Sequence, residues 1–475
     1  MYEKKDIIKF YNAFARDREF WRVKNKYYHQ ELNRLVSFLV PQKSSVVEIG
    51  CSDGELLDTL KPVEGVGVDF SENMLECAKK KYPNYTFELQ DAEDIKLERK
   101  FDYIVMSDLV GELNDVWKAF RELKKITHSR SRVVVTYHNF LWEPFLKLAE
   151  RLKLKIPQMN QNWLSLKDLR DLLDLNGYEV IKEGYHLLFP KHIPILSAFM
   201  NKFIAKLPFI KKLCLIIYLV AREKENEGVE NTKEFSCSII IPTKNEAGNI
   251  EGAVERVPNI GKSFELIFVD GNSTDGTVEK INDMKEKYKD KKDISLIHQG
   301  DGKGKGDAVR KGFAAAKGDV LMILDSDLTV PPEELPQFYC ALSEGRGDFI
   351  NGCRLVYQME SQAMRFLNLL GNKFFGMLFS WILEQPIKDT LCGTKVLFKS
   401  DYERIVAGRD YFGDFDPFGD FDLLFGASKL NMKIVEMPVH YKDRVYGDIK
   451  IRRFFHGWLL LRMSGLAFLK LKMFS

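Results

Sequence analysis

The sequence contains little cysteine and no long apolar run. Its seven cysteines are scattered along 475 residues and never form a CxxC pair, which argues against a disulfide framework and a structural zinc site. No uncharged apolar stretch reaches the roughly 18–20 residues that a transmembrane helix needs. The first residues, MYEKKDIIKF, include no apolar signal region. These absences predict a cytoplasmic protein without a transmembrane helix.

Acidic residues are missing from one long segment. Residues 187–222 contain six Lys or Arg and no Asp or Glu, and residues 440–475 contain eight basic and two acidic residues. Each segment carries +6, so the rest of a chain with net charge +3 carries −9. Basic, apolar-rich segments indicate an anionic partner. We expect a membrane surface and not nucleic acid, because the basic residues alternate with Leu, Ile and Phe and no nucleic-acid motif occurs.

Short apolar runs alternate with helical patterns in both halves of the chain, which predicts an α/β fold with parallel sheets. The expected strands are 46–49, 65–68, 103–106, 133–136, 213–221, 238–241, 266–269, 295–298 and 320–324. A charged stretch almost free of apolar residues, 223–236, predicts a linker. We therefore expect two tandem domains, 1–222 and 237–475, the first preceded by helical residues 1–45.

A loop typical of cofactor binding follows the first expected strand. In VVEIGCSDGELL (46–57), Glu48 precedes Gly50 and Gly54, and a helical pattern begins after them. Glycines let the backbone turn tightly beside a ligand, and a helix N-terminus favours polar groups. The next strand ends in Asp69, where a carboxylate can accept hydrogen bonds from ribose hydroxyls. Asp91 lies at the end of a further strand region, which runs to residues 90–93 between the expected strands 65–68 and 103–106. Its carboxylate can accept a hydrogen bond from an adenine amino group there.

Over residues 25–222 these motifs resemble the class I S-adenosylmethionine-dependent methyltransferases, which have a Rossmann-like fold. The resemblance implies S-adenosylmethionine as cofactor, with Glu48, Gly50 and Gly54 at its methionine end, Asp69 at the ribose and Asp91 at the adenine. A nicotinamide dehydrogenase fits less well, because a diphosphate favours GxGxxG.

The family pattern leaves two points open in this half. Ser52 replaces the usual middle glycine of the loop, which asks only for slightly different backbone torsions. The methyl acceptor is not specified by any motif. The candidates on its side of the site are Asp108, Glu112, Tyr137 and His138.

Four polar motifs in the second half stand at or after expected strand ends. They are PTKNE (242–246), VDGNSTDGT (269–277), the glycine-rich basic loop GDGKGKGDAVRKG (300–312) and DSDLTV (325–330). Two carboxylates one residue apart, Asp325 and Asp327, suit a hard divalent cation that bridges the phosphates of a nucleotide diphosphate. The order of the four motifs predicts a nucleotide-sugar site.

Residues 235–460 resemble family 2 glycosyltransferases of the GT-A fold. The resemblance implies a nucleotide-diphosphate sugar as donor and Mg²⁺ or Mn²⁺ as cofactor. The implied donor residues are Pro242, Asn245, Glu246 and Asp270 at the base and ribose, and Lys305 at the diphosphate. Asp325 and Asp327 are implied at the metal, with Asp327 also catalytic.

Within that family the sequence is most similar to dolichyl- and polyprenyl-phosphate sugar transferases, which implies polyprenyl phosphate as acceptor. Arg354 and Arg365 would bind the lipid phosphate, and Arg444 and Lys450 would lie on a loop that closes over both substrates. Asp389 is expected to act as a base or an orienting group.

Two departures from the family pattern qualify this assignment. Thr329 stands where relatives often have Gln, which puts a third metal contact in doubt. The QxxRW signature of processive synthases is absent, which argues against a chain-building enzyme.

Three further segments predict contact with a membrane surface. Residues 361–383 form a helical pattern with one thin polar stripe, and 189–212 and 454–472 are apolar with only basic charges. The working hypothesis is a bifunctional enzyme on the cytoplasmic face of the membrane. Two alternatives remain: the first half is a non-catalytic docking or regulatory module, or the sugar acceptor is a soluble or protein hydroxyl.

Overall fold

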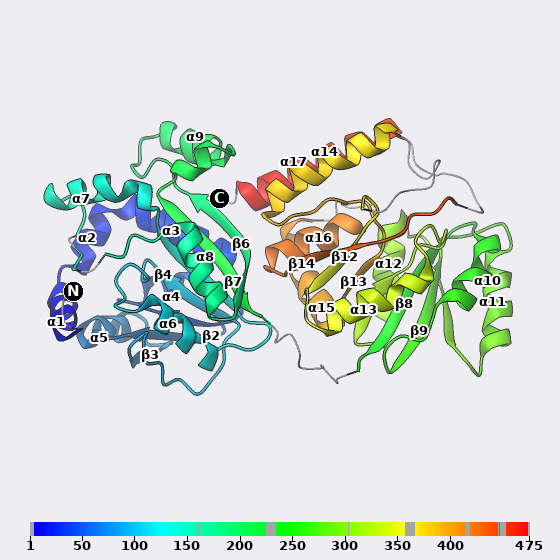
Figure 1. The fold of residues 1–475 in the computed structure, drawn as a ribbon, viewed down its shortest axis with the longest axis horizontal. Helices are drawn as coiled ribbons and strands as arrows, with labels where there is room; N and C mark the ends of the chain where they lie inside the picture. The colour runs from blue at the N-terminus through cyan, green and yellow to red at the C-terminus, as the bar shows by residue number, and fades with distance from the viewer. Residues whose placement is uncertain are drawn as a thin grey trace. The chain divides into compact units, whose positions relative to one another are not determined.

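The computed structural model describes residues 4–156, 158–159, 161–224, 234–302, 304–356, 366–413, 419–444, 446 and 453–473. The chain divides into two compact units, residues 1–224 with 473–475, and residues 225–472 (Figure 1). Of the expected linker, residues 225–233 lie outside the described part. Among the described residues no helix is long and apolar enough to cross a membrane.

The first unit contains nine helices and seven strands within its described residues. The helices are α1 (Lys4–Phe14), α2 (Arg18–Lys24), α3 (Lys26–Leu39), α4 (Glu55–Leu60), α5 (Glu72–Lys81), α6 (Val116–Glu122), α7 (Glu143–Arg151), α8 (Leu166–Leu175) and α9 (Leu196–Lys202). The strands are β1 (Ser45–Ile49), β2 (Glu64–Asp69), β3 (Thr86–Leu89), β4 (Tyr103–Ser107), β5 (Arg132–His138), β6 (Tyr178–His186) and β7 (Ile216–Glu223).

The seven strands form one sheet in the order β3-β2-β1-β4-β5-β7-β6. Strands β1 to β5 are parallel, as expected, but β7 runs antiparallel to both β5 and β6. The expectation of a wholly parallel sheet was therefore wrong at this edge. The sequence reading also missed β6, whose mixed apolar and charged residues give a weak strand pattern.

Helices cover both faces of this sheet. Successive residues of a strand point to opposite faces, so Val46 packs in the core under α3, α4 and α5, whereas Val47 packs in the core under α6 and α8. The carboxyl ends of β1 to β5 meet at one edge, where loops from each strand converge. This edge positions the candidate cofactor site.

The second unit has a sheet in the order β10-β9-β8-β11-β13-β12-β14. Its strands are β8 (Ser236–Thr243), β9 (Ser263–Asp270), β10 (Asp293–His298), β11 (Val320–Ile323), β12 (Phe349–Cys353), β13 (Lys395–Phe398) and β14 (Ile434–Pro438). Its helices are α10 (Ala247–Arg256), α11 (Thr277–Tyr288), α12 (Gly304–Ala315), α13 (Leu335–Ser343), α14 (Phe366–Leu383), α15 (Lys399–Ala407), α16 (Asp420–Lys429) and α17 (Arg453–Ala467).

This second sheet is also mixed. Strands β8 to β11 are parallel, and β13 is antiparallel to its neighbours β11 and β12. The parallel strands bring the motifs at the carboxyl ends of β8, β9 and β11 to one edge of the sheet. The core between sheet and helices is built from apolar residues of β8, β9, α10 and α13.

Candidate functional sites

The loop after β1 turns by placing three residues in the left-handed backbone region. Gly50 and Gly54 both have φ of 77°, and Ser52 has φ of 50°. A side chain at Gly50 would collide with Leu109, and one at Gly54 with Phe87. Ser52 therefore adopts a backbone conformation that glycine adopts more easily. This differs more from ordinary backbone torsions than the slight change expected from the sequence.

Two buried carboxylates lie beside this loop. Asp69 accepts hydrogen bonds from the backbone N–H groups of Ser52 and Ser71, each at 2.9 Å, which fixes its orientation. Burial raises the pKa of Asp69, although these backbone donors oppose the rise. Glu48 is 3% exposed, and its Oε2 is buried without a hydrogen-bond partner among the described residues. Burial also raises the pKa of Glu48 well above its usual range.

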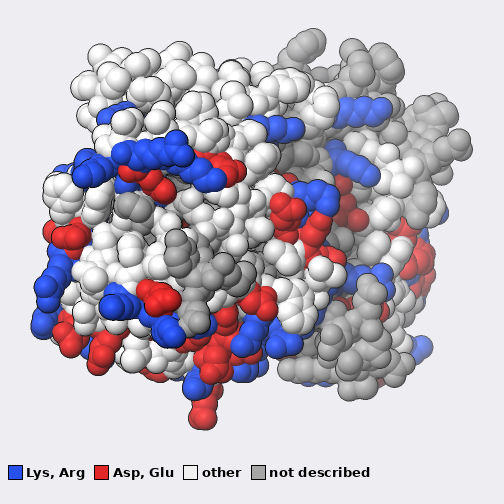
Figure 2. All heavy atoms as spheres, turned by 60° about the vertical axis from the view of Figure 1, so that its left-hand side comes forward, with Lys and Arg blue, Asp and Glu red and all other residues white. Residues whose placement is uncertain are grey.

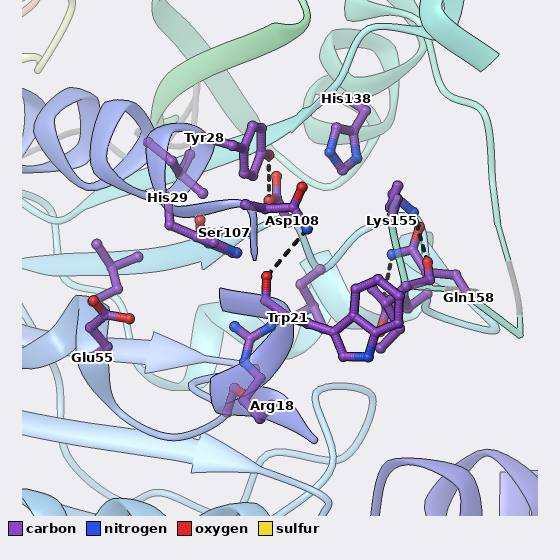
Figure 3. A pocket seen from close by; sticks show the side chains of 18 of the residues that line it. Arg18, Trp21, Tyr28, His29, Glu55, Ser107, Asp108, His138, Lys155 and Gln158 are labelled. Carbon is purple, nitrogen blue, oxygen red and sulfur yellow. Dashed lines mark hydrogen bonds between the residues drawn. The ribbon is translucent and has the colours of Figure 1, made fainter. Parts of the chain in front are cut away.

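The loop and the carboxylates line a cavity of about 390 Å³. Helices α1, α2 and α3 form one wall of it, and the loops after β4 and β5 form another (Figure 3). The unpartnered Glu48 oxygen, the oriented Asp69 and the glycine turn fit a nucleoside that carries a polar, amino-acid-like tail. The residues therefore fit S-adenosylmethionine.

Asp91 lies in a smaller cavity that shares Gly50 and Asp69 with the large one. Its carboxylate pairs with Lys4 and accepts a hydrogen bond from the Glu93 N–H at 2.9 Å. The structure thus brings all five expected cofactor residues to one edge of the sheet.

Sequence reasoning missed the contribution of the N-terminal helices. Arg18 from α2 and His29 from α3 both line the large cavity. Asp53, in the cofactor loop, is buried and pairs with Arg22 of α2 at 2.9 Å and with Lys81 of α5 at 2.8 Å. The Arg22 pair holds α2 over the loop, and the Lys81 pair ties the loop to α5. Only the spacing of basic residues in 18–22 could have suggested the first of them.

Three of the four acceptor-side candidates line the same cavity. Tyr28 donates a hydrogen bond to Asp108 Oδ2 at 2.6 Å and stacks on His138 (Figure 3). Asp108 Oδ1 is buried without a hydrogen-bond partner among the described residues. Glu112 accepts from Gln158 at 2.5 Å. Tyr137, by contrast, donates its hydroxyl hydrogen to the carbonyl of Asn162 at 2.6 Å, which makes it a support for the wall.

In the second unit the two aspartates after β11 each face a cation. Lys305 lies 2.5 Å from Asp325, and Arg444 lies 2.5 Å from Asp327 and 3.5 Å from Glu246. Burial alone raises the pKa of Asp325, but the charge of Lys305 and other nearby cations lowers it overall. Thr329 donates to Asp327 through both its N–H and its hydroxyl, so this residue orients a carboxylate.

The donor-side residues lie in the neighbouring loops. Pro242 and Asp270 occupy the ends of β8 and β9, and Asp270 Oδ1 is buried without a hydrogen-bond partner among the described residues. Asn245, with φ of 51°, accepts a hydrogen bond from the Thr274 N–H at 2.9 Å, which ties the two loops together. Glu246 accepts from Asn249 at 2.7 Å. The unpartnered Asp270 oxygen beside these loops can accept a hydrogen bond from a nucleobase N–H or a ribose hydroxyl.

Asp389 and Arg354 form a buried ion pair. Arg354 donates from Nε and from a terminal nitrogen to the two Asp389 oxygens, at 2.7 and 2.8 Å, and Asp389 is fully buried. Burial alone raises the pKa of Asp389, but Arg354 and backbone donors lower it overall. A Cβ at Gly393 would collide with Asp325 and Lys305, so the turn after Asp389 packs against these two residues. Arg365 and Lys450 lie outside the residues whose side chains the structure describes.

The carboxylates after β11 are the candidate ligands for a divalent cation. Among the described residues no group of three or more His, Cys, Asp or Glu side chains could hold a metal. Mg²⁺ is commonly held by one or two carboxylates together with substrate phosphates. Asp325 and Asp327 fit that arrangement, provided that the donor supplies the remaining ligands.

Both halves match known domain families. Residues 20–183 match the methyltransferase domain, and residues 238–405 match glycosyl transferase family 2. The chain joins a methyltransferase domain to a family 2 glycosyltransferase domain. The two matches fall on the two compact units, and each includes its strand-end motifs.

Relatives of the glycosyltransferase domain include lipid-phosphate sugar transferases. A dolichol-phosphate mannosyltransferase of Pyrococcus furiosus is 31% identical over 224 residues, which are 46% of this chain and 60% of the relative. An undecaprenyl-phosphate 4-deoxy-4-formamido-L-arabinose transferase of Salmonella paratyphi B is 26% identical over 230 residues, 45% of this chain and 62% of the relative. The chain thus spans less than two thirds of the length of these relatives.

The methyltransferase domain is similar to solved structures. A SAM-dependent methyltransferase of Thermotoga maritima aligns over 100% of its own length with 46% of this chain, with 20% sequence identity and a TM-score of 0.37.

Proposed function

We propose that the glycosyltransferase domain transfers a sugar from a nucleotide-diphosphate donor to polyprenyl phosphate, with inversion at the anomeric carbon. One observation carries the proposal: the two carboxylates after β11 face Lys305 and Arg444, and the charge of Arg354, which pairs with Asp389, also acts on Asp325. Cations and carboxylates at one sheet edge suit a reaction between two phosphorylated substrates. The two lipid-phosphate sugar transferases among the relatives support this choice of acceptor.

The proposed chemistry needs no strong general base. A phosphate monoester is largely an oxyanion at neutral pH, because its second pKa is about 6. Its oxygen can attack the sugar directly once cationic side chains hold it near the donor diphosphate. A divalent cation bound by Asp325 and Asp327 would neutralise the departing diphosphate.

We assign Asp389 to positioning and not to proton transfer. Both of its oxygens are engaged by Arg354, and its pKa is lowered overall, so it is a weak proton acceptor. Its bidentate contact fixes the plane of the guanidinium. Arg354 also lies over the Tyr441 ring at 5.1 Å, which leaves it oriented for an anionic ligand.

We propose that the N-terminal domain transfers a methyl group from S-adenosylmethionine. When bound, this cofactor supplies an electrophilic methyl group. Glu48 and Asp69 would hold it, α2 would exclude water, and Asp108 and His138 would face the acceptor. Alignment and water exclusion are the main requirements of such a displacement.

The chain is proposed to act at a membrane surface without crossing it. In α14 two polar residues face the protein: Asn372 is 8% exposed, and Ser380 donates to the Ile387 carbonyl at 2.8 Å. The exposed side chains described on this helix are Phe374 at 51%, Met377 at 69% and the basic Lys373. Such a polarity supports an interface with lipid.

An extraction assay tests the sugar transfer. Full-length protein with Mg²⁺ or Mn²⁺ and polyprenyl phosphate is incubated with labelled UDP- and GDP-sugars, and Asp325→Ala serves as control. Label in the organic phase from one donor, lost in Asp325→Ala, is the expected result. Transfer to a water-soluble hydroxyl instead would move the enzyme to another acceptor class.

A further inference from the structure

Helix α9 has its polar and apolar faces reversed relative to an ordinary surface helix. Its buried residues are Ser197 and Asn201, at 2% and 5% exposed, whereas Leu196 and Phe199 are 44% and 53% exposed. Asn201 accepts from the Phe189 N–H at 2.8 Å and donates to its carbonyl at 2.9 Å. The polar stripe is therefore anchored to the protein and the apolar stripe faces outward.

The reversed pattern extends beyond α9. We define the apolar platform as α7 together with residues 193–213. Its exposed apolar side chains include Phe145, Leu148, Ile195, Phe203 and Phe209, and Ile195 and Phe209 are 86% and 89% exposed. No residue of α7 is buried. Trp142, before α7, donates to the Leu213 carbonyl at 2.8 Å, which joins the two parts. Water disfavours a continuous apolar surface of this kind.

The platform carries six basic and two acidic residues, and both acidic residues are paired with lysines. Residues 187–222 contain no acidic residue. On α7, the acidic residue Glu143 pairs with Lys147, and Glu150 lies 2.7 Å from Lys155. Figure 2 shows a largely uncharged area across the top of this face, bordered below by Lys and Arg side chains with some Asp and Glu side chains among them. Exposed apolar side chains bordered by cations complement an anionic lipid surface, where tails meet charged headgroups.

The large cavity of the methyltransferase domain opens on this platform. Of the described residues that line it, only Phe145, Leu154 and Lys191 are exposed. Phe145 belongs to the platform, and Leu154 and Lys191 lie just outside it, after α7 and before residue 193, so the cavity opens at the edge of the platform. The deeper lining includes the polar side chains Asp108, His138 and Glu112. An acceptor therefore passes from an apolar, basic mouth to a hydrogen-bonding interior.

We infer that the methyltransferase domain rests on an anionic lipid surface through the apolar platform and methylates a hydroxyl on the head of a lipid-linked molecule. This inference rests on the proposed methyl transfer. The acceptor O–H donates to the unpartnered Asp108 Oδ1. The acceptor oxygen forms the new bond to the methyl carbon as the carbon–sulfur bond breaks, its electron pair returns to sulfur, and the proton passes to Asp108.

Photocrosslinking tests the platform without depending on activity. Full-length protein is mixed with phosphatidylglycerol vesicles that contain a photoactivatable lipid, and adducts are mapped by mass spectrometry. Adducts in residues 140–154 and 193–213 are expected, and vesicles of phosphatidylcholine alone should give at least tenfold fewer. Adducts confined to residues 366–473, or no adducts at all, would overturn the inference and leave the platform as a protein contact.

Methyl transfer tests the acceptor. Two probes are compared, a polyprenyl-phosphate hexose in the same vesicles and the water-soluble hexose 1-phosphate. The double variant Ile195→Glu/Phe209→Glu should lose at least tenfold in labelling of the lipid probe while its affinity for S-adenosylmethionine stays unchanged. The matched control is Val63→Glu, at a site 74% exposed and outside the platform.

The outcomes separate the inference from the proposed function. Failure of the wild type to bind S-adenosylmethionine would reject the methyltransferase proposal, and the crosslinks would still decide the platform. If the wild type binds S-adenosylmethionine but does not label the lipid probe, the assignment of a lipid-linked acceptor is overturned. Equal methylation of the soluble probe by the wild type and the double variant would overturn it too.

Discussion

At the scale of single residues, the sites are defined by which buried charges have partners. Arg354 and Asp389 satisfy each other, whereas Glu48 and Asp270 each keep a buried oxygen without a partner among the described residues. Because an unpartnered buried oxygen is costly, the last two are the positions where a bound ligand gains most. The sequence identified all four residues but not this difference between them.

Asp389→Asn tests the positioning role. The change removes the charge that balances Arg354, and loss of one partner of a buried pair costs about 3–5 kcal/mol. We expect a lower melting temperature and a KM for polyprenyl phosphate raised at least tenfold. The pH profile of kcat should keep its shape, because no proton is transferred through this group. Loss of an ionisation from that profile would instead identify Asp389 as a base. Glu436, which accepts from the Asp389 N–H at 2.9 Å, offers a neighbouring control as Glu436→Gln.

His29 gives the methyltransferase domain a pH-dependent stability. Burial and the nearby Arg18 lower its pKa to about 4. The unfolded chain then binds a proton near pH 6.5 that the folded chain does not, so stability is full at higher pH and falls as pH drops below 6.5. The loss is about 2 kcal/mol at pH 5. Melting curves at pH 7.5 and 5 should therefore differ less in His29→Gln than in the wild type, and an equal difference would contradict the assignment.

At the scale of elements, loop geometry and helix polarity decide function. The cofactor loop depends on residues in the left-handed region, and the apolar platform depends on a helix whose polar stripe faces inward. The loop was predictable, because glycine spacing after a strand is a local signal. The reversed helix was expected only as an apolar, basic segment, because which stripe is buried depends on Tyr27 and Phe189, partners outside the helix.

Gly54→Ala should weaken cofactor binding. Its φ of 77° costs an alanine roughly 1–2 kcal/mol, and a Cβ there would also collide with Phe87. Gly276→Ala is the matched control, since φ is 88° there and the Cβ would meet nothing within 4 Å. Calorimetry should show an S-adenosylmethionine affinity reduced at least tenfold in Gly54→Ala and unchanged in Gly276→Ala. Equal affinities would show that the loop does not contact the cofactor.

At the scale of the whole molecule, two separate sheets carry two separate sets of site residues. The residues expected to hold S-adenosylmethionine all belong to the first unit, and the described residues expected to hold donor and metal all belong to the second. Neither set includes a residue of the other unit. The two reactions should therefore respond to different perturbations.

Chelation and mutation should separate the two activities. Removal of divalent metal by EDTA should abolish sugar transfer and leave methyl transfer unchanged, because Asp325 and Asp327 lie in the second unit. Asp69→Ala should abolish S-adenosylmethionine binding and leave sugar transfer within twofold of wild type. Parallel assays on one preparation check both, and loss of both activities in either case would show that the reactions are coupled.

The sequence alone determined the two α/β domains and predicted most of the candidate site residues, because parallel strands bring their carboxyl ends to one edge and short motifs mark those ends. The tertiary structure alone decided the rest. It placed α1 to α3 over the cofactor loop, paired Arg444 with Asp327 and Arg354 with Asp389, and turned the apolar stripe of α9 outward. Each of these joins residues far apart in the chain, and no local pattern specifies which distant partners meet.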